Sequence, residues 1–282
     1  MALFYSLKKL LTTFLNWLKY ELALTLDECQ RRIYNGFMNE RHKKILAAII
    51  EEYTTSAVPV GSKILSDKYD FKVSPATIRS DMAELEEGGF LYQTHISSGR
   101  IPTDKGYRLF VEEIMGDKKL SLTEQRKLQS EMLKLKAQNK QLSRVTAKLL
   151  SSLSGNLVIS GLENESYDFG MRELLAKPEF QHVDEFCRIA EALDYIDENV
   201  EAILAKVKDG ETKIFIGSEN PIKGIDNCSM VVTPYTTKTG EKGVLAIVGP
   251  KRMKYAKNKS LLDYVKKMIG GVVVIVLFIN II

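Results

Sequence analysis

Residues 74–108 read SPATIRSDMAELEEGGFLYQTHISSGRIPTDKGYR, and this stretch decides the fold of the first half of the chain. Ser74 belongs to the residue types that cap helix N-termini, and Pro75 suits the first helical turn, where its missing N–H leaves no hydrogen bond unmade. The pair Gly88-Gly89 favours a left-handed turn that ends the helix. The stretch therefore predicts a capped helix followed at once by a short hairpin.

The side chains of this helix divide into two faces. One face is apolar and is formed by Ile78, Met82 and Leu85 at helical spacing. Near the N-terminal end, Thr77, Arg79 and Ser80 point elsewhere, and hydroxyl and guanidinium donors suit base edges and phosphates. Arg79 could instead form an ion pair with Asp81 or Glu84 on its own helix.

The surrounding residues predict a helix-turn-helix. Helices are expected over 40–53 and 62–69, a brief turn over 70–73 leads into the helix after Ser74, and this is the spacing of that motif. Strands over 90–95 and 100–101 and a fourth helix over 103–115 complete the unit. The candidate DNA-binding residues are Ser74, Thr77, Arg79, Ser80, His95, Ser97, Ser98 and Arg100. His95 could serve equally as a hydrogen-bonded strut that orders the hairpin.

Residues 121–153 contain neither Pro nor Gly and begin with a capping box made by Ser121 and Glu124. They predict one long helix within a linker over 117–153. Apolar residues recur in heptads, and the candidate dimerisation residues are Leu128, Met132, Leu135, Asn139, Leu142 and Leu149. Two interpretations stay open: a parallel coiled coil that pairs two chains, or an amphipathic helix packed on its own chain.

The remainder alternates short apolar runs with turns and helices. Strands are expected over 157–161, 213–217, 229–235 and 243–249, and helices over 183–208 and 255–268. This mixture indicates an α+β fold whose sheet is antiparallel, most simply with neighbouring strands paired. The expected divisions are an amphipathic extension at 1–37, a winged-helix domain at 38–116, the linker at 117–153, an effector domain at 154–271 and an apolar tail at 272–282.

Both ends of the chain leave alternatives open. For residues 1–37 the alternatives are an upstream extension, a misplaced start, or a segment that belongs to the fold. The tail is too short for an ordinary transmembrane helix and suits a buried edge strand better than a weak membrane anchor. No stable membrane association is expected.

Composition and charge exclude several classes of protein. Lys and Arg match Asp and Glu at ten each over 38–110, whereas residues 117–153 carry nine basic and three acidic residues, an excess of six. Cys29, Cys187 and Cys228 are scattered, which favours a reducing cytoplasm and gives no disulfide framework or metal site. The three histidines are dispersed, and no nucleophile elbow, P-loop or dinucleotide fingerprint occurs, so an enzyme, a metal centre or a cofactor is not expected.

Several motifs resemble the heat-inducible transcription repressor family HrcA. Its DNA-binding segment is similar to PVGSK at 59–63, VSPATIR with an Asp-Met at 73–82, and HxSxGRIPTxxGYR at 95–108. Four shorter segments resemble the effector domain of that family: PEF at 178–180, IGSEN at 216–220, CSMVVTPY at 228–235 and GPKRMKY at 249–255.

The resemblance implies a dimeric repressor of chaperone genes. It implies an N-terminal winged helix, a GAF-like effector domain with an inserted dimerisation segment, an inverted-repeat operator in double-stranded DNA, a homodimer, and maintenance of activity by the GroEL chaperonin.

The chain also departs from the family. Ser80 replaces the usual Asn, Ile96 and Ser98 replace Thr and Ala, and a much longer run is usual between Leu153 and Pro178. The chain is therefore expected to be either a minimal member or one with an incomplete effector domain.

The alternative function is a ligand-sensing transcription regulator whose C-terminal domain binds a small molecule. The basic cluster Lys251, Arg252, Lys254, Lys257 and Lys259 could form an anion site, although a solvated helix start is the simpler interpretation.

Overall fold

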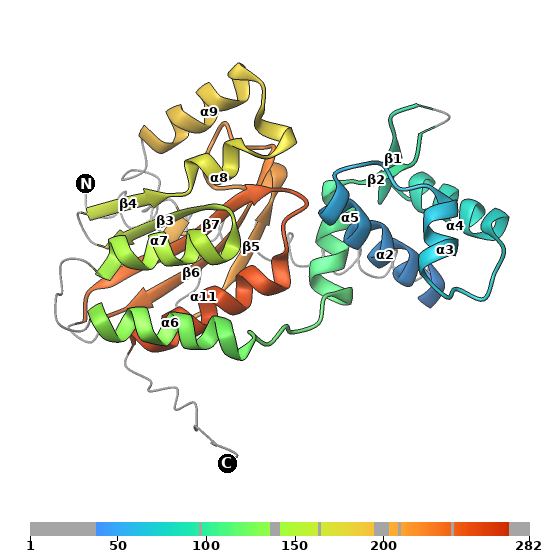
Figure 1. Ribbon diagram of the computed structural model, residues 1–282. Coiled ribbons are helices and arrows are strands. Elements are labelled where there is room, and N and C mark those ends of the chain that lie inside the picture. The colour runs from blue at the N-terminus through green and yellow to red at the C-terminus, as the bar shows by residue number, and fades with distance from the viewer. Residues whose placement is uncertain are drawn as a thin grey trace, which may run out of the picture.

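The computed structural model describes residues 38–95, 98–135, 142–162, 165–194, 203–207, 210–237 and 240–270. Within these residues the chain forms two units that pack against each other (Figure 1). One is helical and carries a hairpin, and the other is built on a five-stranded antiparallel sheet. The predicted α+β class is confirmed.

The helical unit contains the elements expected around residues 74–108. In chain order these are α2 (Glu40–Ser56), α3 (Ser62–Lys68), α4 (Pro75–Glu87), β1 (Leu91–Gln93), β2 (Arg100–Pro102), α5 (Asp104–Leu109) and the π-helical turn η1 (Phe110–Ile114). Helix α2 begins where the Asn39 side chain accepts a hydrogen bond from the backbone N–H of His42, at 2.8 Å. The antiparallel hairpin pairs Tyr92 with Ile101, and β1 is shorter than the predicted strand over 90–95.

One apolar core holds the three helices of this unit together. Ile45 and Ile49 of α2 and Leu65 of α3 are fully buried. From α4, Ile78, Met82 and Leu85 are at most 1% exposed, which confirms the apolar face expected from their spacing. Because this face is buried, the opposite face of α4 points to solvent.

The prediction of one long helix over 121–153 is wrong. The segment forms two helices, α6 (Leu122–Leu135) and α7 (Leu142–Ser154), which pack against each other. Lys127 donates to Ser152 and Thr146 donates to the sulfur of Met132, so the two helices run antiparallel. The capping box is present, because Ser121 and Glu124 exchange hydrogen bonds between side chain and backbone N–H at 3.0 and 3.2 Å.

The sheet contains all four predicted strands and a fifth. Its strands are β3 (Leu157–Leu162), β4 (Glu165–Phe169), β5 (Lys213–Ile216), β6 (Cys228–Thr236) and β7 (Lys242–Pro250), in the order β4-β3-β7-β6-β5. All pairs are antiparallel, and three of the four join strands that are neighbours in sequence; β3 with β7 is the exception. Strand β4 was not expected, because its sequence ESYDF lacks an apolar run.

Alternating side chains give the sheet two buried faces. Val158, Val231 and Ile247 face one side and join the core formed with α7 and with α11 (Tyr255–Ile269). Ile159, Val232 and Ala246 face the other side, which α8 (Met171–Leu175), the short helix η3 (Pro178–Phe180) and α9 (Val183–Asp194) cover. The predicted helix over 183–208 is confirmed as far as Asp194, and residues 195–202 lie outside the described residues.

The expectations for residues 1–37 and 272–282 also lie outside the described residues. Within the described part of the chain, no helix is long and apolar enough to cross a membrane.

Candidate nucleic-acid interface

Helix α4 is fixed at its N-terminal end by its own cap. The Ser74 hydroxyl accepts a hydrogen bond from the backbone N–H of Thr77 at 3.1 Å, as the sequence predicts. The Ser74 and Thr77 hydroxyls also lie 3.0 Å apart. The remaining N–H groups of the first turn carry the positive end of the helix dipole, which favours a phosphate.

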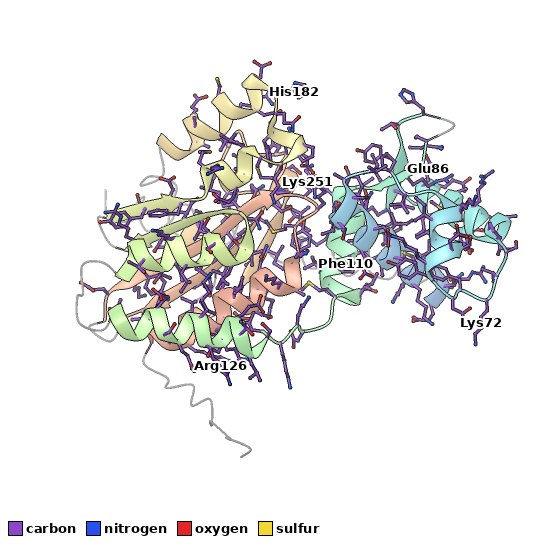
Figure 2. The ribbon with its side chains drawn as sticks, viewed as in Figure 1. Lys72, Glu86, Phe110, Arg126, His182 and Lys251 are labelled. Carbon is purple, nitrogen blue, oxygen red and sulfur yellow. The ribbon has the colours of Figure 1, made fainter. Side chains whose placement is uncertain are left out.

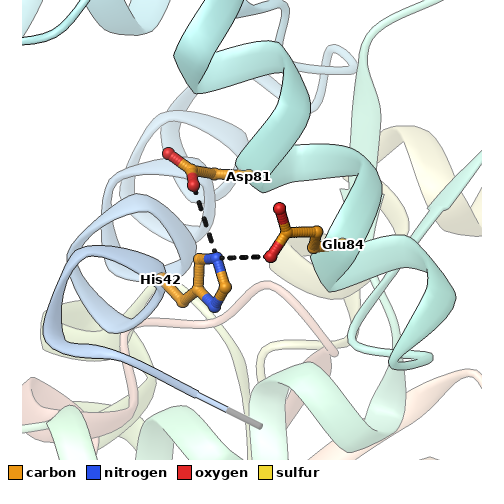
Figure 3. Close-up of side chains that lie close together, drawn as sticks. All are labelled: His42, Asp81 and Glu84. Atoms are coloured by element: carbon orange, nitrogen blue, oxygen red, sulfur yellow. Dashed lines mark ion pairs between the residues drawn. The ribbon is translucent and has the colours of Figure 1, made fainter.

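A cluster of charged and polar side chains around the buried His42 and Asp81 fixes the inner side of α4 to α2 (Figure 3). Arg41 donates to both carboxylate oxygens of Asp81, each at 2.8 Å. The His42 Nε2 atom lies 3.4 Å from the same carboxylate and 3.3 Å from that of Glu84. The hydrogen bonds to Asp81 raise the pKa of Arg41, so its guanidinium stays charged.

The same three side chains, His42, Asp81 and Glu84, are close enough to hold a cation. Arg41, however, already engages both oxygens of Asp81 and brings a positive charge to the place where the ion would bind. The arrangement therefore suits an ion-pair network that joins α2 to α4 better than it suits a metal centre.

The outer face of α4 is open to solvent. Ser74, Arg79 and Ser80 are exposed, and Thr77 is partly exposed. Arg79 forms an ion pair with neither Asp81 nor Glu84: Asp81 pairs with Arg41, and the Glu84 carboxylate lies 3.3 Å from the Nε2 atom of His42. Among the described residues Arg79 has no ion-pair partner, so its guanidinium is available to a ligand.

The hairpin places its predicted residues differently. His95 is exposed near the tip, whereas Ser97 lies outside the described residues. Ser98 turns inward: its hydroxyl accepts from the backbone N–H of His95 at 3.0 Å and donates to the His95 carbonyl at 2.7 Å. Ser98 therefore shapes the turn, and His95 supplies backbone rather than side-chain bonds to it.

Arg100 braces the hairpin against the end of α4. Its side chain is only 13% exposed, and its Nε donates to Glu86 at 3.0 Å. Its backbone exchanges two hydrogen bonds with Val60, at 2.9 and 3.0 Å. A side chain held in this way is a poor candidate for direct contact with bases.

Gly99 allows this close approach. A Cβ atom at this position would lie 2.5 Å from backbone carbons of both Pro59 and Val60, closer than any real contact. Gly99 is therefore required by packing between the hairpin and the segment before α3. The motif at 95–108 contains this glycine, but its sequence does not identify the segment against which Gly99 packs.

The candidate dimerisation residues are largely used within the chain. Leu128, Met132 and Leu149 are at most 6% exposed and belong to the chain's own core. Leu135 and Leu142 lie in helices, but their side chains, like all of Asn139, are outside the described residues. The three buried residues therefore fit the interpretation in which this segment packs against its own chain.

The basic cluster after β7 is also engaged in ion pairs. Lys251 pairs with Asp104, Arg252 with Glu179, Lys257 with Glu124, and Lys259 with Asp263. Four of the five cations are thus neutralised by carboxylates, and the structure offers no support for an anion site here.

Comparison with known proteins gives consistent matches. The family model described as HrcA protein C terminal domain matches residues 109–258, more than half of the chain. A protein of Alkaliphilus metalliredigens (strain QYMF) named heat-inducible transcription repressor HrcA is 46% identical over 123 residues, covering 44% of this chain and 36% of that protein. The corresponding match in Leptospira biflexa is 45% identical over 117 residues and covers 34% of the relative.

Longer matches have lower identity. The protein of the same name from Carboxydothermus hydrogenoformans is 27% identical over 337 residues, with 84% of this chain and 98% of the relative covered. Since 337 aligned residues exceed the 282 of this chain, the relative contains stretches with no counterpart here. A crystal structure described as a hypothetical protein has the same fold, with a TM-score of 0.66 at 18% identity, covering 83% of this chain and 98% of that chain.

Proposed function

Because the chain belongs to the HrcA family, we propose that it is a sequence-specific transcriptional repressor that binds an inverted-repeat operator in double-stranded DNA. Its helical unit, residues 38–116, is a winged helix-turn-helix in which α3 and α4 form the motif and β1 and β2 the wing. The observation that carries the proposal is the capped α4, whose buried side is fixed by Arg41 and Asp81 and whose outer side presents an exposed Arg79 with no ion pair among the residues that the structure describes.

In this mechanism α4 enters the major groove with its N-terminal end foremost. Arg79 donates two hydrogen bonds to the O6 and N7 atoms of a guanine, the pairing for which a guanidinium is best suited. Ser74, Thr77 and Ser80 donate to phosphates or neighbouring base edges. These contacts need no rearrangement of α4, since its outer face is already exposed.

The wing contacts the sugar-phosphate backbone or the minor groove through His95 and Ser97. Ser98 and Arg100, which were also expected to touch DNA, support the wing instead by closing its turn and by pairing with Glu86. Lys63 in the first turn of α3 and Lys72 in the turn before α4 are also exposed, and they add phosphate contacts within the motif.

The remaining residues complete a dimeric regulator. Residues 117–153 form the linker, and 154–271 form the GAF-like effector and dimerisation domain, so that each of two chains reads one half-site. Relatives are named heat-inducible repressors, and we extend this role to the chain: it represses chaperone genes in the cytoplasm.

Selection from a randomised duplex library tests the assignment of function. Rounds of binding and amplification should enrich one inverted repeat, and Arg126→Ala, which removes an exposed arginine on α6 far from α4, should enrich the same sequence (Figure 2). Enrichment of no sequence would refute a sequence-specific DNA-binding protein, whereas enrichment of a single unrepeated site would refute only the dimeric arrangement.

The chaperonin GroEL is the proposed partner that maintains the active fold. We expect addition of GroEL and ATP to raise the fraction of protein molecules that bind the selected duplex, since a protein with a marginal domain exposes apolar surface that a chaperonin recognises. The active fraction is measured by titration with excess duplex. An active fraction that does not change would remove GroEL from the proposal.

A further inference from the structure

The last three residues of the motif at 95–108 do not lie on the face of the helical unit that is proposed to bind DNA. Gly106, Tyr107 and Arg108 lie on α5, which faces the sheet unit, while α4 lies on the far side of the helical unit (Figure 1). Tyr107 is 1% exposed, and its ring meets that of Tyr255 edge-on with centroids 6.1 Å apart. Gly106 lets α5 pack closely, because a Cβ there would lie 2.3 Å from the Phe90 carbonyl oxygen.

Arg108 connects α5 to one end of strand β5. Its guanidinium donates to the backbone carbonyl of Ile214 at 2.9 Å and to the carboxylate of Glu219 at 3.0 Å. Glu219 is itself held by the backbone N–H of Ile216, also at 3.0 Å. An arginine of the first unit is therefore bound to a carboxylate whose position depends on the sheet.

Two further contacts join the units around this point. Asp104, in the first turn of α5, pairs with Lys251 at 2.7 Å. Arg252 donates to the carbonyl of Thr54 in α2 at 2.9 Å and to Glu179 at 3.1 Å. Segments 106–108, 178–180, 216–220 and 249–255, which are scattered in sequence, thus meet at one junction.

We propose that this junction is a latch between the DNA-reading unit and the effector domain. The latch comprises Asp104, Tyr107 and Arg108 on one side and Glu219, Lys251 and Arg252 on the other. When it is closed, it holds α4 in a fixed orientation relative to the sheet, and when it opens, the reading unit is joined to the rest only through the segment between Ile114 and Leu122. The regulatory part of this inference rests on the proposed function.

The chemistry of the latch makes it suited to opening. Two of its ion pairs, Arg108 with Glu219 and Asp104 with Lys251, lie at a partly exposed surface, where salt and competing water weaken them. The edge-on contact of Tyr107 with Tyr255 is buried and belongs to an apolar cluster that both units share, so the ion pairs are the part of the junction that opens most readily. Among the described residues the buried Tyr107 hydroxyl has no hydrogen-bond partner, so the closed latch retains an unfavourable contribution that opening relieves.

A closed latch should raise the DNA affinity most when one dimer binds both half-sites of an inverted repeat. Two reading units of a dimer bind an inverted repeat together only when their α4 helices are separated by about one turn of DNA, roughly 34–36 Å, or a multiple of it. Fixed units meet this requirement before binding, whereas loosely joined units lose effective concentration at the second half-site. Opening should therefore weaken binding to the inverted repeat and leave binding to one half-site unchanged.

The experiment compares Arg108→Ala and Arg252→Ala with the control Arg126→Ala in the full chain, each first checked for folding by far-UV circular dichroism. Small-angle X-ray scattering should give a larger radius of gyration for both latch variants. The wild type should expand similarly between about 0.1 and 1 M salt, where the screening length falls from about 10 to about 3 Å. The control should behave as the wild type does.

Affinity supplies the second measurement. Both latch variants should bind the selected inverted repeat at least about tenfold more weakly and a single half-site equally well. Tyr107→Phe, which keeps the ring contact and removes the buried hydroxyl, should not weaken either affinity.

Unchanged scattering in both variants, or equal weakening on both duplexes, would overturn the latch. If the wild type bound no duplex, the proposed function would fail, and the scattering comparison would still decide whether the junction is a latch.

Discussion

At the scale of single residues, two arginines of one recognition segment have different environments. Arg79 is exposed on α4 without an ion pair among the described residues, whereas the Arg100 side chain is only 13% exposed and pairs with Glu86. From the sequence both were predicted to contact DNA, Arg79 at the bases and Arg100 through the wing. Only the fold reveals that Asp81, one of the two carboxylates on its helix considered as partners of Arg79, is paired with Arg41 instead.

Replacing Arg79 tests its assignment to base recognition. Arg79→Ala should weaken binding to the selected duplex by about 1–3 kcal/mol and should remove discrimination at one base pair of each half-site. Binding curves with every single-base variant of the half-site measure both effects. An unchanged order of preference among these duplexes would show that Arg79 does not read a base.

Replacing Arg100 should have a different effect. Arg100→Ala removes the charged hydrogen bond to Glu86 and should lower the free energy of unfolding by about 1–2 kcal/mol. Urea denaturation measures this loss, and affinities for all duplexes should fall together. Loss of discrimination at a single base pair would instead mean that Arg100 contacts DNA directly.

At the scale of secondary-structure elements, sequence patterns predicted where helices begin better than they predicted what each helix packs against. The Ser74 cap and the capping box at Ser121 appear as expected, because each depends on residues three positions apart. The apolar repeat containing Leu128 and Met132 shows only that a helix buries one face. A second chain and an antiparallel neighbour satisfy the same repeat, so the break between α6 and α7 could not be inferred from it.

The end of α2 offers a test of backbone strain. Ala57 has a φ of 56° and donates its backbone N–H to Tyr53, a left-handed position that glycine adopts without steric cost. Ala57→Gly should raise the free energy of unfolding by about 1 kcal/mol. Ala47→Gly, in the interior of the same helix, should lower it by about 1 kcal/mol. Urea midpoints that shift in the same direction for both variants would contradict the strain at Ala57.

The start of α6 predicts a pH dependence. A hydrogen bond from Lys257, followed by those from the backbone and hydroxyl of Ser121, lowers the pKa of Glu124 from 4.5 to about 2. A lowered pKa in the folded state means that the carboxylate stabilises the fold above pH 4.5 and that this contribution is lost as the pH falls toward about 2.

Glu124→Gln measures that contribution. Between about pH 6 and pH 3 the unfolding free energy of the wild type should fall further than that of the variant, as determined by urea denaturation at each pH. Parallel curves for the two proteins would mean that Glu124 titrates equally in the folded and unfolded chain.

At the scale of the whole molecule, the sequence predicted two units but not how they meet. The strands over 213–217, 229–235 and 243–249 were found from their apolar runs, and β4 was missed because it is polar. Contacts such as that between Arg108 and Glu219 join residues 111 positions apart, and no local pattern encodes such a pair. Residues 106–108 were part of a motif that resembles a DNA-binding segment, but they lie between the two units.

The mass of the protein in solution and on DNA tests the central claim most directly. Light scattering of the purified chain, alone and with the selected inverted-repeat duplex, gives the number of chains in each species. We predict a dimer that binds one duplex with both chains, one reading unit on each half-site. A single chain bound to the inverted repeat, with the second half-site left empty at saturation, would contradict the account of this protein as a dimeric repressor.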